Sequence, residues 1–262
     1  MKCILFLKSK LIPYHIGKLY QEPVSTIHIL SMTEIGTTDY RSVQVILLVN
    51  NSDDTKHRIA EELGRDLTIK LYRAFVQDIL DTLDSSDLRY AISLYPENSD
   101  IYEWLDRDVI VYTQRGNTPV ERVKNTFIDA FSRGENKVMV LVSDIPDIPA
   151  EEIMEAIYSF KDSDAVIGPS VDGGYNIIGF SEESFRESAF DNISWGTDMA
   201  FADTAEKLGG LKIYLLSPWP DIDTIANLRS LLKDKRNPKF QTSHTMEVLS
   251  ETSLVNKSSC GI

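Results

Sequence analysis

Acidic residues recur in three short stretches that suit metal-assisted chemistry: SDIPD with Asp144, DGGY with Asp172 and PDIDT with Asp223. Hard divalent cations prefer carboxylate oxygens together with the phosphates of a bound substrate. Two carboxylates from separate loops could therefore bracket a metal that also holds a diphosphate. We predict Asp144 and Asp223 as metal ligands and Mg²⁺ or Mn²⁺ as the cofactor. Each residue also has a structural alternative, because aspartate commonly caps helices or initiates turns.

Two adjacent glycines follow Asp172 between two apolar runs, in AVIGPSVDGGYNIIGF. A tight hairpin turn would explain them, since glycine adopts positive φ at little cost. Alternatively, Gly173 and Gly174 could let the backbone approach a ligand closely while Asp172 holds a polar group or a metal. The acidic loop around Asp144 follows the preceding predicted strand, which favours a site over an isolated turn.

Composition limits the function further. The 262 residues are 42% hydrophobic and 26% charged, which is typical of a globular protein, and the net charge is −13. Such an acidic chain argues against nucleic acid or an anionic membrane as a partner. No apolar run approaches the roughly 20 residues of a membrane span, and the opening residues make a poor signal peptide. We therefore predict a cytoplasmic protein. The separated Cys3 and Cys260 suggest neither zinc nor a disulfide framework.

Apolar runs alternate with amphipathic segments from residue 43 onward, which predicts βαβ units and a mostly parallel sheet. The expected strands are 43–49, 89–95, 109–113, 137–142, 164–169, 175–180 and 212–216. The expected helices are 58–83, 99–105, 119–133, 150–160, 197–208 and 225–235. Ligands bind such sheets beyond the carboxyl ends of the strands, where the acidic loops fall.

Both ends differ from this alternating middle. Residues 1–40 include a short strand-like run but no clear period, and we predict a peripheral N-terminal extension or a start codon placed upstream of the true one at Met32. Residues 41–235 form the predicted domain. Residues 236–262 are rich in polar residues and are predicted to be a flexible tail.

Four motifs, taken in order, resemble the DUF2064 family of glycosyltransferase-like proteins: VSDIPDIP, GPSVDGGYNIIGF, ISWGTDMAFADTAEKLG and WPDIDTIANL. Members of this family, also called the rSAM/selenodomain-associated transferase 1 type, show G-S-D-x-P, G-P-x-x-D-G-G-Y, W-S-T and D-x-D-T. The resemblance covers roughly residues 43–235. It implies an α/β fold of the nucleotide-diphospho-sugar transferase (GT-A) type, a three-layer α/β/α sandwich with a mostly parallel mixed sheet.

The resemblance also implies roles for individual residues. Asp144 would hold the metal, with Asp223 as its distal acidic partner. Asp172 would act in catalysis, and Asp198 is a candidate base that could equally cap the following helix. The residues expected to bind substrate are Lys56, Arg58, Arg122, Gly173, Gly174, Tyr175, Trp195 and Thr197. Trp195 has the alternative of a plain core residue.

The chain departs from the family in its first nucleotide loop, where Asn-Ser-Asp-Asp replaces Pro-x-Pro-Gly, although Lys56 and Arg58 stay in register. We predict a metal-dependent glycosyltransferase-like enzyme that uses a nucleotide sugar or a nucleoside triphosphate and a small-molecule acceptor. One alternative is a nucleotidyltransferase similar to 2-phospho-L-lactate guanylyltransferases. A second alternative is a non-catalytic nucleotide-binding or regulatory protein on the same fold. The sequence does not indicate an oligomeric state.

Overall fold

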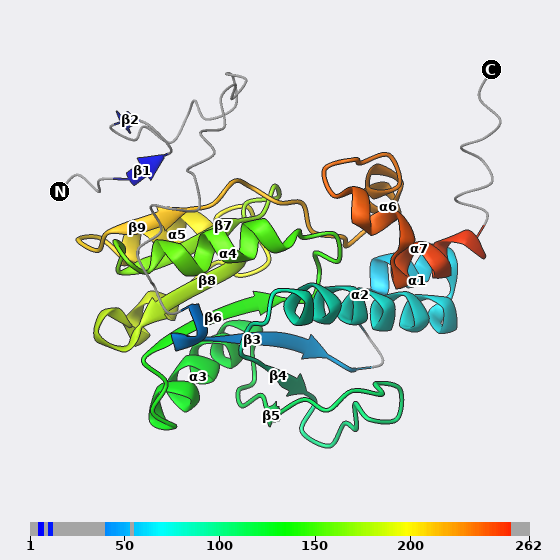
Figure 1. Ribbon diagram of the computed structural model, residues 1–262, viewed down its shortest axis with the longest axis horizontal. Coiled ribbons are helices and arrows are strands. Elements are labelled where there is room, and N and C mark those ends of the chain that lie inside the picture. Colours follow the sequence, from blue (N-terminus) through cyan, green and yellow to red (C-terminus); the bar gives the residue numbers. More distant parts are fainter. Residues whose placement is uncertain (1–4, 8–9, 13–39, 53–54, 253–262) are drawn as a thin grey trace.

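The computed structural model describes residues 5–7, 10–12, 40–52 and 55–252. Among these residues, nine strands form one sheet in the order β2-β1-β9-β7-β8-β6-β3-β4-β5 (Figure 1). The strands are β1 (Leu5–Leu7), β2 (Lys10–Ile12), β3 (Val43–Asn50), β4 (Tyr90–Tyr95), β5 (Val111–Thr113), β6 (Lys137–Val142), β7 (Ala165–Pro169), β8 (Tyr175–Ser181) and β9 (Ile213–Leu215). Most pairs are parallel, but β8 runs antiparallel to both of its neighbours, β6 and β7.

Helices cover both faces of this sheet (Figure 1). They are α1 (His57–Leu63), α2 (Arg65–Ser85), α3 (Pro119–Ser132), α4 (Ala150–Ser159), α5 (Ala200–Lys207), α6 (Ile225–Leu231) and α7 (His244–Ser250). Short 3₁₀ turns lie at Tyr40–Ser42, Glu182–Ser184, Glu187–Phe190 and Pro238–Thr242. No helix in the described part of the chain is long and apolar enough to cross a membrane.

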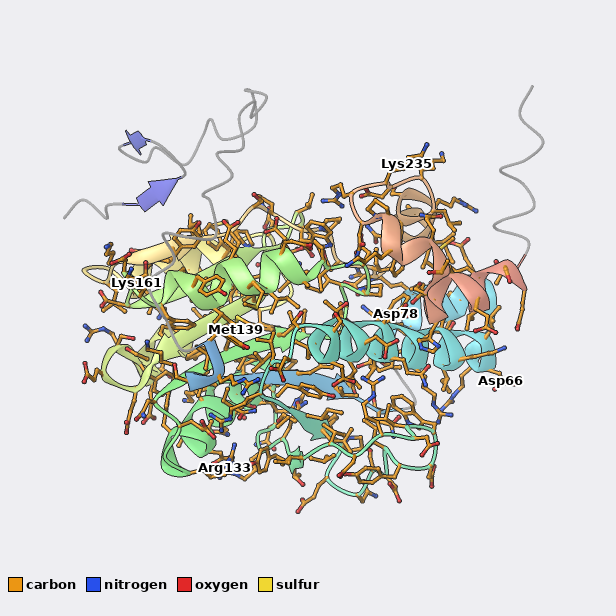
Figure 2. The ribbon with its side chains drawn as sticks, viewed as in Figure 1. Asp66, Asp78, Arg133, Met139, Lys161 and Lys235 are labelled. Atoms are coloured by element: carbon orange, nitrogen blue, oxygen red, sulfur yellow. The ribbon has the colours of Figure 1, made fainter. Side chains whose placement is uncertain are left out.

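Strand alternation explains the three layers. Val45 and Leu47 of β3 pack with α2 and α4 on one face, whereas Ile46 points to the other face and packs with α3. Both sets are fully buried because the strands lie between two helical layers. Met139 of β6 lies inside the molecule, while the labelled Asp66, Lys161 and Lys235 lie toward the outside (Figure 2). The predicted three-layer α/β/α fold is therefore confirmed.

Several local predictions need correction. The helix expected over 58–83 is interrupted at Gly64, which has φ +82° and separates α1 from α2. Residues 99–105 form turns and not the expected helix, although Ile101 and Leu105 are buried. The helix expected from residue 197 begins at Ala200. In each segment apolar residues reach the core as their spacing predicts, although the backbone is not helical throughout.

The predicted flexible tail from residue 236 is wrong for residues 236–252. The 3₁₀ turn Pro238–Thr242 and α7 dock on the rest of the fold, with Phe240, Val248 and Leu249 buried in the main core. Three well-placed apolar residues thus outweigh the polar composition of this segment. Residues 253–262 lie outside the described residues, as does most of the predicted extension over residues 1–40. Of that extension, β1 joins the sheet edge beside β9.

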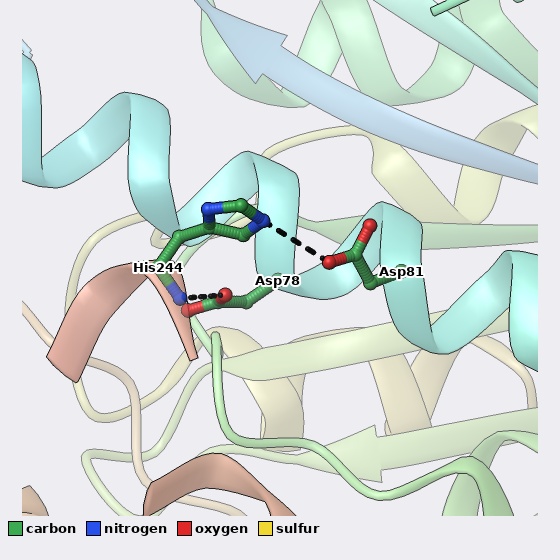
Figure 3. A group of neighbouring side chains, drawn as sticks. All are labelled: Asp78, Asp81 and His244. Carbon is green, nitrogen blue, oxygen red and sulfur yellow. Dashed lines mark hydrogen bonds and ion pairs between the residues drawn. The ribbon is translucent and has the colours of Figure 1, made fainter. Parts of the chain in front are cut away.

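A buried carboxylate from α2 secures this docking. Asp78 accepts hydrogen bonds from the backbone N–H groups of His244 (2.8 Å) and Thr245 (2.9 Å) at the start of α7. Next to it, the His244 ring lies 3.2 Å from a carboxylate oxygen of Asp81 (Figure 3). Asp78, Asp81 and His244 could geometrically surround a metal ion. However, the Asp78 carboxylate already accepts two backbone hydrogen bonds at the start of α7, whose N-cap is Ser243, so the group is explained as a structural clasp.

Candidate active site

A cleft of about 410 Å³ opens at the carboxyl ends of β3 and β6. Because these parallel strands end at the same edge of the sheet, the loops that follow them meet there. The starts of α1 and α3 close two further sides. The cleft is lined by Leu48, Val49, Asn50, Thr55, Lys56, His57, Arg58, Tyr72, Gln114, Pro119, Arg122, Val123, Val142, Ser143, Asp144, Asp172, Trp195, Gly196 and Asp223.

The structure brings together seven of the residues singled out from sequence. These are Lys56, Arg58, Arg122, Asp144, Asp172, Trp195 and Asp223. The remaining candidates, Gly173, Gly174, Tyr175, Thr197 and Asp198, do not belong to the lining of this cleft. Three cationic and three acidic side chains therefore share one concave surface, an arrangement suited to an anionic ligand with a bound cation.

Lys56 joins the two predicted metal ligands. Its ammonium lies 2.8 Å from Asp144 Oδ1 and also donates a hydrogen bond to Asp223 Oδ1. Only 6% of the Lys56 side chain is exposed, against 35% for Asp144 and 39% for Asp223. Burial lowers the pKa of Lys56, but the charges of the two carboxylates outweigh it and raise that pKa above its usual value. The resemblance placed Lys56 on nucleotide phosphates, whereas here it contacts carboxylates.

A compact acidic group lies next to this ion pair. Carboxylate oxygens of Asp172, Asp221 and Asp223 all lie within 4.8 Å of one another. The pKa of Asp221 is raised to about 6 by burial and by the neighbouring charges of Asp172 and Asp223, although a hydrogen bond from Ser170 opposes this. Burial also acts to raise the pKa of Asp223, but the charge of Lys56 more than offsets it and the pKa is lowered. Concentrated oxygen ligands with mutual repulsion fit a hard divalent cation.

Asp221 adds to the ligands predicted from sequence. It was visible as the first aspartate of PDIDT, but only Asp223 was assigned to the metal. The spacing within this motif does not indicate that Asp221 lies close to Asp172, which follows the end of β7 and precedes Asp221 by about 50 residues. That proximity depends on the chain crossing back beside Ser170, which bridges to Trp219.

The two glycines of the Asp172–Tyr175 loop make different contacts. Gly173 has φ +96°, and a Cβ atom there would lie 2.3 Å from the carbonyl oxygen of Asp198. Its own carbonyl accepts from Phe201 N at 2.9 Å, so Gly173 packs directly on the 198–201 backbone. Gly174 has an ordinary φ, and its N–H donates to Asp172 Oδ1 at 3.0 Å. The pair therefore shapes a turn that docks one loop of the site on another.

Aromatic rings define the wall beyond this loop. Trp195 lines the cleft and contacts the buried Tyr175 edge-on, with ring centroids 5.3 Å apart. Tyr175 thus supports Trp195 from the core side. Thr197 donates a hydrogen bond to the Ser194 carbonyl (2.6 Å), which closes the turn that carries Trp195. Asp198 lies in the same turn, and its backbone packs on Gly173.

Tyr72 and Gln114 also line the cleft, although the sequence did not predict either as a site residue. The Tyr72 hydroxyl lies 2.6 Å from Ser143 Oγ and accepts from Asn50 N at 2.8 Å, which ties α2 to the ends of β3 and β6. Gln114 donates from Nε2 to the carbonyls of Val49 (3.2 Å) and Ser93 (2.6 Å). Tyr72 occupies an apolar position of α2 and gave no signal. The sequence pattern likewise gives no sign that Gln114 would lie in the cleft.

Arg122 and Arg58 supply the unburied positive charge. The Arg122 guanidinium lies over the Tyr95 ring, 4.1 Å from its centroid, at the first turn of α3. Arg58 is exposed in the first turn of α1 and acts at longer range to lower the pKa of Asp223. Both side chains line the cleft and could meet an anionic ligand without leaving an ion pair among the described residues.

The chain is similar to known proteins in both sequence and fold. The model of the family described as "uncharacterized protein conserved in bacteria (DUF2064)" matches residues 80–197. A crystal structure from Desulfovibrio desulfuricans G20, assigned to the nucleotide-diphospho-sugar transferases, has a TM-score of 0.77 and 33% identity, covering 82% of this chain and 97% of that one.

Two more distant relatives share part of the sequence or the fold. The 2-phospho-L-lactate guanylyltransferase of Methanocaldococcus jannaschii is 25% identical over 157 residues, which are 58% of this chain and 66% of that protein. The match thus spans just under two thirds of the guanylyltransferase. The 4-diphosphocytidyl-2C-methyl-D-erythritol synthase of Anaerococcus prevotii DSM 20548 shares the fold, with a TM-score of 0.50 and 15% identity over 75% of this chain and 100% of that one. The chain belongs to the DUF2064 family and has the nucleotide-diphospho-sugar transferase fold.

Proposed function

We propose that the chain transfers a group from a nucleoside triphosphate or a nucleotide sugar to a small-molecule acceptor, with the help of Mg²⁺ or Mn²⁺. The observation that carries this proposal is the composition of one cleft. It combines Asp172 and Asp223, which have Asp221 next to them, with the cationic side chains of Lys56, Arg58 and Arg122. Binding a diphosphate with its metal calls for both kinds of side chain, because cationic side chains contact the phosphate oxygens and carboxylates hold the divalent metal.

Each part of the cleft has a task in this reaction. Asp172, Asp221 and Asp223, with Asp144 beside them, would hold the metal, which when bound neutralises charge on the diphosphate leaving group. Arg58 and Arg122 would bind the phosphates of the donor. Trp195 offers a flat apolar face at the far wall, where an acceptor or sugar can stack. Catalysis then consists mainly of positioning and charge stabilisation.

Two transferase reactions fit this arrangement. Glycosyl transfer releases a nucleoside diphosphate, whereas nucleotidyl transfer to a phosphorylated small acid releases pyrophosphate. The similarity to the guanylyltransferase favours the second reaction as the alternative to test first. A non-catalytic nucleotide-binding role stays a third candidate because Asn-Ser-Asp-Asp stands in the first loop.

A ligand panel separates these candidates. Melting temperature is measured with Mn²⁺ and each of the four ribonucleoside triphosphates, and then with uridine- and guanosine-diphosphate sugars. A ligand at 100 times its dissociation constant stabilises the fold by about 2.7 kcal/mol, which a thermal shift detects readily. Release of pyrophosphate or of nucleoside diphosphate on adding candidate acceptors then identifies the reaction. Failure of every nucleotide to shift the melting temperature at millimolar concentration would reject the proposal.

A further inference from the structure

The strongest unexplained feature of the cleft is a buried lysine at the place where a metal is expected. Lys56 is 6% exposed and binds Asp144 and Asp223 simultaneously. Its backbone adopts φ 54° and ψ 38°, the left-handed region that side chains other than glycine rarely occupy. The chain therefore holds an ammonium between two carboxylates in spite of burial and backbone strain.

This ion pair competes with any divalent cation. Asp223 belongs both to the acidic group and to the pair with Lys56. Asp144 is held by the same ammonium at 2.8 Å. The ammonium occupies one oxygen of each carboxylate, and its positive charge repels a divalent cation at the neighbouring oxygens, so metal binding at these residues favours the withdrawal of Lys56.

A withdrawn ammonium needs a new anion. An unpaired charge in a partly buried position is costly, so a metal that displaces Lys56 on its own binds weakly, and a negative group that takes up the displaced ammonium strengthens its binding. The cleft that Lys56 lines also contains Arg58 and Arg122, where the proposed function places the donor phosphates. The diphosphate is thus the nearest replacement partner.

We propose that Lys56 is the resident cation of this site. It pairs with Asp144 and Asp223 while no divalent ion is bound, and it transfers its contacts to the diphosphate of the donor when Mn²⁺ or Mg²⁺ binds those carboxylates. This inference rests on the proposed function, since it requires a metal and a diphosphate in the same cleft. Its consequence is coupling: metal and diphosphate each bind weakly alone and strengthen one another.

Lysine labelling of the unaltered protein tests the exchange directly. An amine-acetylating reagent is applied briefly, and labelling at Lys56 is measured by mass spectrometry. Lys56 should react slowly without metal, faster with Mn²⁺ alone, and slowly again with Mn²⁺ plus pyrophosphate. Lys70 of α2 is half-exposed and paired with Glu251. It serves as the internal control, and its labelling should not change on adding Mn²⁺ or pyrophosphate. Unchanged or reduced labelling of Lys56 on adding Mn²⁺ alone overturns the inference.

Calorimetric titration of two variants gives a second, independent readout. Lys56→Met removes the competing ammonium but keeps much of its bulk, whereas Lys70→Met removes a half-exposed ammonium that lies outside the cleft. We expect Lys56→Met to bind Mn²⁺ about tenfold more tightly than the parent, equivalent to about 1.4 kcal/mol, and Lys70→Met to change by less than about threefold. Pyrophosphate should strengthen Mn²⁺ binding in the parent and in Lys70→Met, but much less in Lys56→Met.

The outcomes distinguish this inference from the proposed function. If the parent binds neither Mn²⁺ nor Mn²⁺–pyrophosphate, the metal-dependent function and the exchange both fail. If the parent binds both, but Lys56→Met binds Mn²⁺ equally or more weakly and keeps the full coupling, only the exchange fails. Should Lys56→Met not fold, the labelling pattern of the parent decides alone.

Discussion

A methyl group added at Gly173 probes how the acidic turn is docked in the site. Gly173 has φ +96°, and its added Cβ would lie 2.3 Å from the Asp198 carbonyl oxygen and 2.4 Å from Asp198 Cα. Both contacts are with backbone, which cannot rotate away as a side chain can. Gly174 is the matched control, because its φ is ordinary and the nearest atom to its added Cβ is Asp172 Oδ1, a side-chain atom 3.3 Å away.

The expected costs follow from these differences. In Gly173→Ala the unfavourable φ contributes about 1–2 kcal/mol, and displacing the Asp198 backbone adds about 1–3 kcal/mol, as in other overpacked sites. The total loss in the free energy of unfolding is therefore about 2–5 kcal/mol. For Gly174→Ala we expect a change of at most about 1 kcal/mol, since the lower entropy of the unfolded chain offsets part of the crowding.

Urea unfolding of both variants measures these free energies, and melting temperature gives a second estimate. For a chain of this size, 1 kcal/mol corresponds to about 2–4 °C, so Gly173→Ala should melt at least about 4 °C below the parent. Gly173→Ala should also weaken Mn²⁺–pyrophosphate binding, because Asp172 of the acidic group immediately precedes Gly173 in the displaced turn. Equal costs for the two variants, or a larger cost at Gly174, would refute this account of the loop.

Three further predictions follow from the described contacts. Ending the chain at residue 235 should lower the free energy of unfolding by about 3 kcal/mol or more, since it removes the buried Phe240, Val248 and Leu249; unchanged urea unfolding would show that α7 adds no stability. Burial raises the pKa of Asp78 despite its hydrogen bonds from Thr245 and His244, so the folded state favours the protonated acid. The parent should therefore lose stability relative to Asp78→Asn as the pH rises from about 4 through that raised pKa, and a difference in the opposite direction between pH 4 and 7 would contradict the assignment. Asp223→Asn should weaken Mn²⁺ binding at least about tenfold, equivalent to about 1.4 kcal/mol, whereas Asp234→Asn at the surface should leave it unchanged in the same titration.

The sequence alone determined the fold class and one edge of the site. Alternating apolar runs and amphipathic helices require βαβ packing, and the carboxyl ends of parallel strands meet at one edge whatever the details of the loops. Asp144, which lies just beyond the end of the buried strand β6, could therefore be placed in the site without coordinates. Asp172 is also placed there, because its turn joins β7 to β8.

Only the tertiary structure decided how these groups interact. Lys56 and Asp223 lie 167 positions apart, and no local pattern indicates that an ammonium from the first loop bridges two carboxylates. The same holds for Gly173, whose conformation is required by contact with the distant Asp198 backbone. Local periodicity reports which face of an element is buried, but pairing between loops depends on the crossing of the whole chain. Segment 236–252 is predicted as flexible from its polar composition, yet it is ordered. Its three apolar residues, Phe240, Val248 and Leu249, pack against core residues that come together only in the folded chain.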